Sequence, residues 1–436
     1  MAPRGMGAAT GLSFAEALTA VVQPARERRR ATEVVPIEQA LGRALSEDVY
    51  SRVALPPWDN AGMDGYAVQK ADVLGADSIA PRVLPVIGTS VAGADPTALP
   101  WVQQGTAVRI MTGAPMPPGA DAVVRVEDTD GGESVVQIRH DRDIVGRGNV
   151  RPRGEDIAAN AVLFAAGTSL RASHLGALAS IGLRGVPVYR APRVTIVSSG
   201  DELVLLDRFA EVESGHRIVS SSSYALPALL RGAGAQVTMA PLVEDSLDAL
   251  TQALGAALDA GCDLLVTTGG VSVGAHDYTR DALAALGGTQ TFWRARIRPG
   301  GPLGTGSVRS VPWLGLPGNP VSTMVTGALF AWPLLRAIGG HAAVHHARVP
   351  VRMMDAADTP APLTYFLRVS LQVAADGVLE ARLAGAQGSN LLRTMALADA
   401  LLEVPETVDR VEPGATMHAV LLPDAPLLFA DGERLS

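Results

Sequence analysis

Residues 263–286 read DLLVTTGGVSVGAHDYTRDALAAL, and this stretch decides the fold class. Asp263–Thr268 is a short apolar run typical of a buried strand, and Tyr278–Leu286 has the apolar spacing of a helix. The loop that joins them, Thr267–Asp277, is rich in glycine. A strand, a loop and a helix in this order indicate an α/β unit in which ligands bind at the carboxyl end of the strand.

The same alternation continues on both sides of this unit. Three further strands are predicted at Arg193–Ser198, Gln236–Val243 and Val311–Leu316, and three further helices around Leu226–Leu230, over Ser246–Ala260 and from Pro320 onward. Strands that alternate with helices favour a parallel sheet that is covered by helices on both faces.

The flanking segments follow different patterns. Ser13 and Glu16 form a capping-box pattern at the start of an amphipathic segment, residues 13–28. Between residues 51 and 150, short Val/Ile runs alternate with Gly, Pro and Asp, which indicates a small β-rich domain. Residues 340–436 again read as short strands and turns. The simplest arrangement inserts the first β-rich segment into a domain built from both its flanks and makes the last segment a separate β domain.

The composition is that of an ordinary globular chain, with 436 residues of which 47% are hydrophobic. The net charge is −8 and Arg26–Arg30 (RERRR) is the one basic block, so a nucleic-acid surface is not expected. Cys262 is the only cysteine, which excludes an internal disulfide and a cysteine zinc site. Because we find neither a signal-peptide pattern nor an apolar run of about 20 residues, we expect a soluble, cytoplasmic protein without a membrane span.

Three loops that follow predicted strands carry candidate chemistry. They are Ser198–Glu202 (SSGDE), Thr267–Asp277 (TTGGVSVGAHD) and Leu316–Ser322 (LPGNPVS). The second loop holds glycines, which let backbone N–H groups approach an anion, and hydroxyl donors: Thr268, Gly269, Gly270, Ser272 and Gly274. Since ligands of such sheets bind at the strand ends, the three loops together predict an anion site there.

The third loop and the acids refine this prediction. Asn319 can cap the helix that follows, with Pro320 at its first position, and the free N–H groups of a helix start favour phosphate or carboxylate. Asp201, Glu202 and Asp277 place negative charge beside such an anion. A divalent cation such as Mg²⁺ would reconcile the acids with the anion.

Structural interpretations compete with each of these. A single glycine-rich turn is more often only a turn, and the absence of a Walker motif and of a GxGxxG after a strand argues against an NTPase and a dinucleotide oxidoreductase. His341, His345 and His346 resemble a metal cluster, but a solvated linker is the better interpretation. Cys262, beside a predicted strand, is expected to be an inert core thiol.

The inserted β-rich segment has three motifs of its own. Asp59–Ala67 (DNAGMDGYA) combines turn formers with two carboxylates, and Ile110–Pro115 (IMTGAP) carries a threonine hydroxyl. Arg151–Asp156 (RPRGED) offers two guanidinium groups, which can grip an oxyanion in bidentate fashion. Each motif alone is more often structural, so their weight comes from their combination.

Seven segments together resemble the molybdopterin molybdenumtransferase family, which includes MoeA and the gephyrin E domain. They are PPWDNAGMDGYAV (56–68), RIMTGAPMPPGADAVV (109–124), RPRGEDI (151–157), SSGDEL (198–203), TTGGVSVGAHDYT (267–279), RPGGPLGTG (298–306) and GLPGNPVS (315–322). The segments occur in the order of the family and extend from about residue 56 to residue 322.

The resemblance implies an elongated homodimer of four-domain subunits. The implied domains are a discontinuous domain I (10–50 and 147–185), an inserted β-rich domain II (51–146), a MogA-like α/β domain III that binds the pterin (186–338) and a C-terminal β domain IV (339–436). The site would lie between domain III of one subunit and domain II of the other. The implied reaction inserts molybdate into adenylylated molybdopterin with release of AMP, assisted by Mg²⁺ or another divalent cation.

The roles of the family's functional residues carry over by motif. The implied catalytic residues are Asp64, Thr112, Glu202, Asp245 and Asp277, of which Asp64, Glu202 and Asp277 would also bind the metal. The implied pterin and phosphate ligands are Thr268, Gly269, Gly270, Ser272, Gly274, Pro317, Gly318, Asn319 and Pro320. Arg298 and Ser322 would bind molybdate.

Three departures from the family pattern leave alternatives open. Ala61-Gly62 stands where the family has Ser-Ala, Gly301 replaces a lysine, and Ser220–Ser222 replaces an Asp-Ser/Thr-Asn segment. A catalytically weakened paralogue that acts as a dimeric scaffold for a protein partner is therefore the second hypothesis. An enzyme that takes tungstate in place of molybdate is the third.

Overall fold

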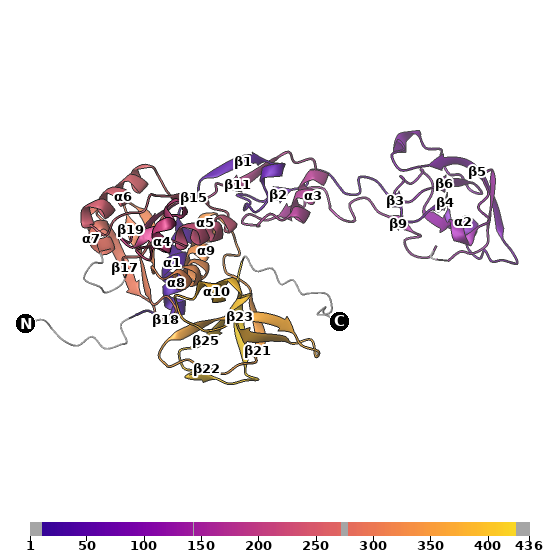
Figure 1. The fold of residues 1–436 in the computed structure, drawn as a ribbon. Coiled ribbons are helices and arrows are strands. Elements are labelled where there is room, and N and C mark those ends of the chain that lie inside the picture. The colour runs from indigo at the N-terminus through magenta and orange to yellow at the C-terminus, as the bar shows by residue number, and fades with distance from the viewer. Residues whose placement is uncertain (1–10, 143, 272–277, 424–436) are drawn as a thin grey trace, which may run out of the picture. The chain divides into compact units, whose positions relative to one another are not determined.

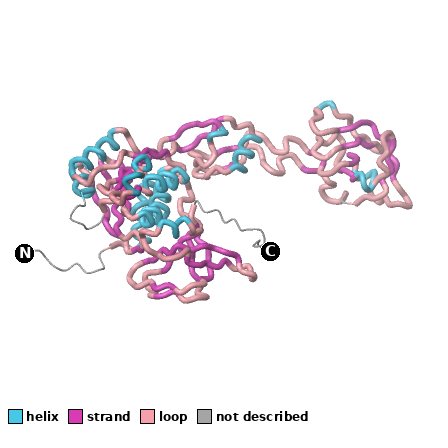
Figure 2. The backbone as a smooth tube through the Cα atoms, viewed as in Figure 1, coloured by secondary structure: helices cyan, strands magenta, loops and turns pink. Residues whose placement is uncertain are grey.

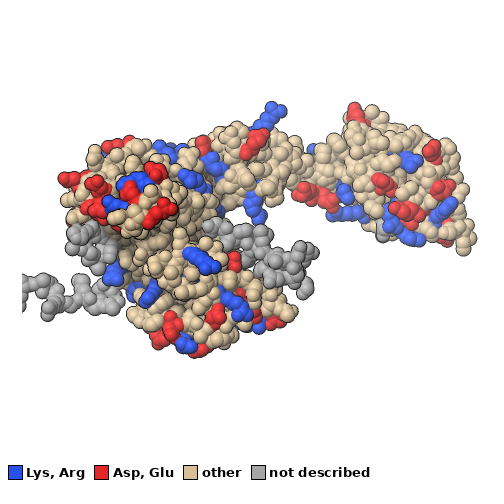
Figure 3. Space-filling model, in the orientation of Figure 1, with Lys and Arg blue, Asp and Glu red and all other residues tan. Residues whose placement is uncertain are grey.

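The structure is a computed structural model that describes residues 11–142, 144–271 and 278–423 (Figures 1 and 2). The chain forms two compact units. The first comprises the described parts of Met1–Glu47, Ala166–Gly176 and Arg184–Ser436, and the second comprises Asp48–Ala165 and Ala177–Leu183. Acidic and basic side chains are interspersed over the face of each unit that Figure 3 shows.

A six-stranded sheet forms the centre of the first unit. Its order is β15 (Gln236–Met239), β12 (Arg193–Ser198), β16 (Leu264–Thr268), β20 (Val311–Leu316), β19 (Pro302–Val308) and β17 (Thr289–Arg294). The first four strands are parallel and confirm the predicted strands, although β15 ends four residues before Val243. The antiparallel strands β19 and β17 extend the sheet beyond the predicted parallel part.

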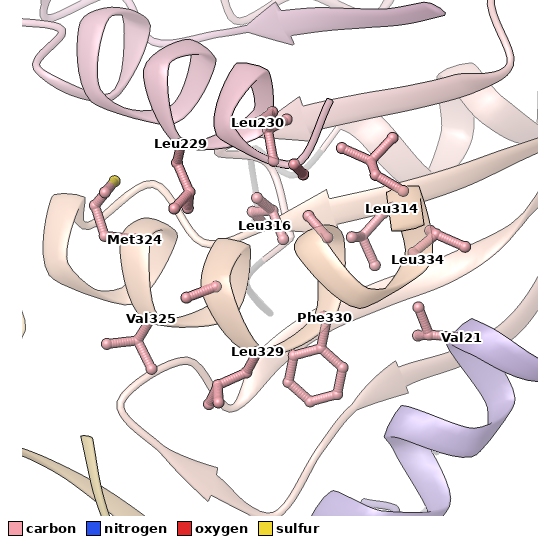
Figure 4. Packing of buried hydrophobic residues seen from close by; sticks show 14 of the residues in the cluster. Val21, Leu229, Leu230, Leu314, Leu316, Met324, Val325, Leu329, Phe330 and Leu334 are labelled. Atoms are coloured by element: carbon pink, nitrogen blue, oxygen red, sulfur yellow. The ribbon is translucent and has the colours of Figure 1, made fainter. Parts of the chain in front are cut away.

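Helices cover both faces of this sheet. Val194 and Ile196 of β12 face a core formed with α1 (Phe14–Glu27), α5 (Ser222–Gly232), α8 (Pro320–Thr326) and α9 (Trp332–Ile338). Val197 faces the opposite core, formed with α6 (Leu247–Asp259) and α7 (Tyr278–Ala285). Successive side chains of a strand point to opposite faces of the sheet, so those of β12 belong to two different cores. Helices on both faces of the sheet are what the sequence predicted. Figure 4 shows Leu229 and Leu230 of α5 above Leu314 and Leu316 of β20.

Two helix starts agree with the sequence pattern. Ser13 and Glu16 form the complete capping box of α1, with Ser13 N donating to Glu16 Oε2 at 2.8 Å. Ser246 caps α6 by accepting a hydrogen bond from the backbone N–H of Ala249. These polar caps begin the helices that carry the apolar stripes.

The segment Pro320–Ile338 is a continuous helical run of 19 residues, in which a π-helical turn at Gly327–Ala331 joins α8 to α9. It is long and apolar enough to cross a membrane, with a mean hydropathy of 1.4. However, 83% of its most apolar stretch of 18 residues is buried inside the structure, as in the core helix of a globular protein.

The C-terminal part of the first unit is a closed barrel. Its strands are β23 (Thr364–Val373), β24 (Leu379–Leu383), β21 (Arg348–Met353), β27 (Thr416–Leu421) and β25 (Ala400–Val404), and β25 closes the ring on β23. The short strand β18 (Ile297–Arg298) pairs with β23 and so ties the barrel to the α/β sheet. This tie brings barrel residues beside the loops of the α/β domain.

The second unit is built on a five-stranded sheet. The order is β7 (Ala122–Arg125), β4 (Gly65–Val68), β6 (Ala107–Ile110), β5 (Arg82–Ser90) and β8 (Val135–Ile138), which confirms the predicted β-rich segment. Strand pairs also join its two flanks: β3 (Asn60–Ala61) with β9 (Val150–Arg151), and β2 (Val49–Tyr50) with β10 (Val162–Phe164). In the first unit, β1 (Thr32–Pro36) pairs with β11 (Gly185–Tyr189).

Candidate functional site

The candidate site lies where three neighbouring parallel strands end in register. Ser198 of β12 lies opposite Thr268 of β16, and Thr268 lies opposite Leu316 of β20. From β12 the chain continues to β15, which lies on one side of β12 in the sheet. After β16 it continues to strands on the opposite side, which include β20. Ligands of open α/β sheets bind at such a reversal of strand order, so the fold places the three predicted loops around a binding crevice.

A cavity of about 430 Å³ occupies this crevice. Its volume lies within the roughly 300–1,000 Å³ of small-molecule sites. The predicted residues that line it are Glu202, Asp245, Thr268, Gly269, Gly270, Pro317, Gly318, Asn319 and Pro320. Ser220–Ser222, where the family pattern changes, line it as well. The remaining predicted residues of the second loop, Ser272, Gly274 and Asp277, lie outside the described residues.

The glycines are required by the backbone of these loops. Gly269 and Gly270 have φ values of +85° and +62°, in the left-handed region that other residues rarely adopt. A Cβ atom on Gly269 would lie 3.0 Å from the carbonyl oxygen of Ser199, and one on Gly318 would lie 3.4 Å from the Cα atom of Gly269. The three loops therefore pack against one another through backbone, a geometry in which backbone N–H groups can bind an anion.

Two expected side-chain roles differ from what the structure shows. Thr268 Oγ1 donates a hydrogen bond to Ser198 Oγ at 2.7 Å, so its hydroxyl joins two strand ends and its proton is already used. Asn319 occupies the N-cap position of α8 with Pro320 after it, but its side chain makes no capping hydrogen bond, so that part of the prediction is wrong. The Asn319 amide instead lies 3.4 Å from Ser389 Oγ, and Val321 N donates to Ser389 O.

Two carboxylates face the cavity without a cationic partner. Glu202 and Asp245 line it, and neither forms an ion pair with a described arginine or lysine. Asp201 Oδ1 accepts a hydrogen bond from the backbone N–H of Asp245 at 3.0 Å, but Asp201 lines a neighbouring cavity with Asp207 and Arg208. Oxygen donors of this kind suit a hydrated Mg²⁺ ion.

The three predicted metal ligands do not form one group within the described residues. Glu202 lies in the first unit and Asp64 in the second, and Asp277 is not described. No set of three or more His, Cys, Asp or Glu side chains able to hold a metal is found in the described part of the chain.

The second unit brings Asp64 and Thr112 together. Asp64 Oδ1 accepts hydrogen bonds from both the hydroxyl and the backbone N–H of Thr112, each at 2.6 Å. The hydroxyl first and the N–H second lower the pKa of Asp64, so the carboxylate stays ionised with Oδ2 free. Thr112 therefore positions Asp64, and both residues are exposed.

The predicted oxyanion ligands lie apart from the cavity lining. Arg298 is exposed, with its guanidinium 5.8 Å from the ring centre of Tyr365, and it lines a separate cavity of about 490 Å³ with Gln387 and Gly388. Ser322 is buried in α8. The loop after Arg298 packs on that helix, since a Cβ atom on Gly300 would lie 3.8 Å from Ser322 O.

Arg368 is a candidate ligand that our sequence reasoning missed. It is fully buried in β23, and its Nη2 donates to the carbonyl oxygens of Ala386 and Gly388 at 3.0 and 3.1 Å. Its Nε and Nη1 have no hydrogen-bond partner, and no described carboxylate pairs with it. Burial lowers the pKa of this guanidinium. A buried cation with unused donors is costly unless an anion pairs with it, which makes Arg368 a candidate oxyanion ligand.

A signal for Arg368 exists in the sequence. It interrupts the apolar run YFLRVSL at 365–371, where a charged side chain is not expected in a buried strand. The loop that it holds also contains Ser389, which contacts Asn319 and Val321 of the candidate site. Residues from the barrel and the α/β sheet thus meet at one place.

The histidine prediction needs correction. His341 is 8% exposed and bonds Ser169 Oγ through Nδ1 at 2.7 Å, so it belongs to the core and not to a solvated linker. Burial, with the charges of Arg336 and Arg43, lowers its pKa to about 3. His345 is exposed, as expected. Cys262 is a buried thiol whose pKa burial raises, which confirms its inert role.

Comparison with known proteins gives matches along most of the chain. Family models described as the MoeA N-terminal region (domain I and II), a probable molybdopterin binding domain and the MoeA C-terminal region (domain IV) match residues 12–182, 195–337 and 350–422.

Individual relatives match at similar length. The chain is 37% identical over 393 residues to Molybdopterin molybdenumtransferase 2 of Mycobacterium tuberculosis, which covers 88% of this chain and 93% of that protein. It is 36% identical over 391 residues to the molybdopterin molybdenumtransferase of a Nostoc species, with 86% of each covered. The crystal structure of a molybdopterin biosynthesis moeA protein from Pyrococcus horikoshii superposes with a TM-score of 0.80 at 26% identity, covering 94% of this chain and 100% of that one.

Proposed function

Since the chain belongs to the molybdopterin molybdenumtransferase family and therefore has a role in molybdenum cofactor biosynthesis, we propose that it transfers molybdenum from molybdate to adenylylated molybdopterin and releases AMP. The match to transferases over most of the chain does not favour the scaffold alternative. The observation that carries the proposal is the cavity at the ends of β12, β16 and β20, because it combines backbone donors with two unpaired carboxylates.

The pterin phosphate would bind at the glycine loop of this cavity. Gly269 and Gly270 both have left-handed backbone, but the N–H of Gly269 already donates to the carbonyl oxygen of Leu316 at 3.1 Å, so the N–H of Gly270 would be the donor to the anion. Pro317 and Pro320 fix the course of the facing loop and so shape the opposite wall. The substrate would be held mainly by backbone groups, so the side-chain changes at Ser220–Ser222 would have little effect on its binding.

The carboxylates would hold a divalent cation, for which Mg²⁺ is the candidate that their oxygen chemistry favours. Glu202 and Asp245 are the described residues that would bind it, and the cation would neutralise phosphate charge. Asp277, predicted as a further ligand, lies outside the described residues. The fixed, ionised carboxylate of Asp64 would orient a water molecule or the cation, with Thr112 holding its position.

The oxyanion substrate would bind where the barrel meets the α/β domain. Arg368 would supply its two unused donors to an oxyanion enclosed there, and Ser389 and Ser322 would add hydroxyl groups near the start of α8. Arg298 replaces the first lysine of the family motif and presents an exposed cation at the neighbouring loop. Arg368 would thus compensate for the second lysine of the family motif, whose position is occupied by Gly301 in this chain.

The homodimer, the cytoplasmic location and the four domains with their stated boundaries also belong to this proposal. In the dimer that the resemblance implies, Asp64 of one subunit would serve the cavity of the other. Mixing Asp64→Asn with Glu202→Gln subunits tests this, because only the mixed dimer would contain one intact site. Recovery of part of the lost activity on mixing supports the shared site, and no recovery contradicts it.

Turnover is the test of the function itself. Product formation from adenylylated molybdopterin with Mg²⁺ is measured while molybdate is titrated, for the wild type and for Asp64→Ala. The proposal expects AMP release and molybdenum insertion that depend on molybdate and fall in the variant. Substrate binding without turnover would refute the transferase activity, and a preference for tungstate over molybdate in the same titration would change the substrate assignment.

A further inference from the structure

A separate cavity in the first unit is lined largely by arginine. It has a volume of about 160 Å³ and is lined by Ala25, Arg28, Arg29, Arg30, Ala31, Arg190, Pro192, Asp263 and Ile338. Pro192 precedes β12 and Asp263 precedes β16, so this cavity lies at the amino ends of the strands whose carboxyl ends form the candidate site. It includes most of the basic block Arg26–Arg30, for which the proposed function has no use.

The charge of this cavity is not balanced by its own side chains. Asp263 is the single carboxylate in the lining, and both its oxygens are already engaged. Its Oδ1 accepts a hydrogen bond from Arg190 Nη2 at 2.9 Å, and its Oδ2 accepts one from the backbone N–H of Arg193 at 2.8 Å. No described carboxylate forms an ion pair with Arg28, Arg29 or Arg30. The lining therefore holds four arginines, of which Arg28 and Arg29 are exposed, and one carboxylate that is already engaged.

Helix capping explains only part of this arrangement. Arg30 donates through Nε to Ala337 O at 2.9 Å and through Nη2 to Arg26 O at 2.8 Å, which satisfies carbonyl groups at the ends of α9 and α1. Arg28 Nη2 donates to Ser310 O at 2.9 Å. These bonds leave Nη1 of Arg30 and Nε and Nη1 of Arg28 without a described partner, and Arg29 makes no hydrogen bond to the described chain. Two of the three arginines are thus held in place with donors to spare.

The volume limits the ligand. Water takes about 30 Å³ in the liquid, so the cavity has room for about five molecules. That is less than the roughly 300 Å³ at which small-molecule sites begin, so the cavity is too small to enclose a nucleotide or a pterin. A single phosphate-sized group does, and the fork of arginine donors matches two oxygens of such a group at once.

We propose that this cavity binds one tetrahedral oxyanion of the phosphate class, through Arg28, Arg29 and Arg30. The bound anion would relieve repulsion among the three guanidinium groups and would join α1 to the amino ends of β12 and β16. Because it binds the folded chain only, it would also raise the unfolding temperature as its concentration rises. The site is independent of the proposed transferase activity.

Phosphate binding to the full chain tests the site. The stoichiometry and affinity of inorganic phosphate are measured by equilibrium dialysis at constant ionic strength, for the wild type, Arg28→Gln and Arg29→Gln. Loss of one charge-assisted contact predicts about tenfold weaker binding in each variant. The matched control is Arg26→Gln, which removes the same charge from the last turn of α1, outside the cavity lining, and it should bind within about twofold of the wild type.

The outcomes separate the site from its alternatives. In Arg28→Gln/Arg29→Gln, the number of bound phosphates should fall by one while the pterin still binds, and phenyl phosphate in place of phosphate distinguishes a phosphomonoester from a free anion. If phosphate binding is weakened equally in Arg26→Gln, the binding comes from the general positive charge of the region and not from this cavity. Phosphate binding to the wild type that does not saturate would also contradict the proposal. Arg29 makes no described hydrogen bond, so loss of folding is not expected to obscure the result.

Discussion

Replacement of Arg368 by methionine is the most informative perturbation of the oxyanion site. Methionine has a similar length and lacks charge, so it fills the same buried volume in β23. The change removes two hydrogen bonds to Ala386 and Gly388 and the unused donors Nε and Nη1. It therefore separates what Arg368 does for the fold from what it does for a bound anion.

The two effects have different expected sizes. Each lost hydrogen bond destabilises the fold by about 0.5–1.5 kcal/mol, but removal of a buried, unpaired charge offsets much of this. A charge-assisted contact to the oxyanion contributes about 1.5–3 kcal/mol, which corresponds to about a tenfold to a hundredfold loss of affinity. We therefore expect a change in unfolding free energy of about 1 kcal/mol or less and a KM for molybdate raised at least tenfold.

The assay compares molybdate titrations with pterin binding in the same preparations. Arg368→Met should raise the KM for molybdate and leave the Kd of adenylylated molybdopterin unchanged, because we propose that the glycine loop, and not Arg368, binds the pterin phosphate. Arg382→Met, on the neighbouring strand β24 with its side chain about half exposed, serves as the control for a lost arginine. An unchanged molybdate KM in Arg368→Met would refute the assignment of Arg368 to the oxyanion. An equal rise in the molybdate KM of Arg382→Met would refute it as well.

Three further predictions concern other parts of the chain. Thr112→Val should raise the pKa of Asp64 toward its ordinary value, because the Thr112 hydroxyl now lowers it. The acid limb of the pH–activity profile should therefore move to higher pH. If the acid limb does not move, Asp64 is not the group that titrates there. Gly269→Ala places an alanine at φ +85° with its Cβ atom 3.0 Å from the carbonyl oxygen of Ser199. The substitution should lower the free energy of unfolding in urea by about 1–2 kcal/mol and should weaken pterin binding. Normal pterin binding would argue against this loop as the phosphate site. His341 has a pKa of about 3 in the folded chain against 6.5 for the free side chain, so below pH 6.5 the unfolded chain binds one more proton than the folded chain. The free energy of unfolding should therefore fall by about 1.4 kcal/mol per pH unit as the pH drops below 6.5. His341→Gln should flatten this slope in acid unfolding titrations, and an unchanged slope would show that other groups cause it.

The sequence predicted the sheet and its loops well because local patterns determine them. β12 and β16 are short apolar runs between turn formers, and the glycine loop after β16 has a positive φ at Gly269 and Gly270 that only its composition could indicate. Neighbouring parallel strands bring their carboxyl ends together, so the grouping of these loops follows from the fold class.

The contacts between distant segments could not be predicted in this way. Asn319 does not cap α8 because Ser389, 70 residues later, lies beside its side chain. His341 lies in the core, where its ring forms a hydrogen bond with Ser169, 172 residues earlier in the chain. Arg368 is held by the carbonyl groups of Ala386 and Gly388, which lie 18 and 20 residues later in the chain. Local patterns carry no information about such partners.

A crystal structure with bound adenylylated molybdopterin tests the central claim most directly. We expect the pterin phosphate to lie in the cavity at the ends of β12 and β16, within hydrogen-bonding distance of the backbone N–H group of Gly270. The same phosphate bound in the neighbouring cavity lined by Asp201, Asp207 and Arg208, or elsewhere on the chain, would contradict it.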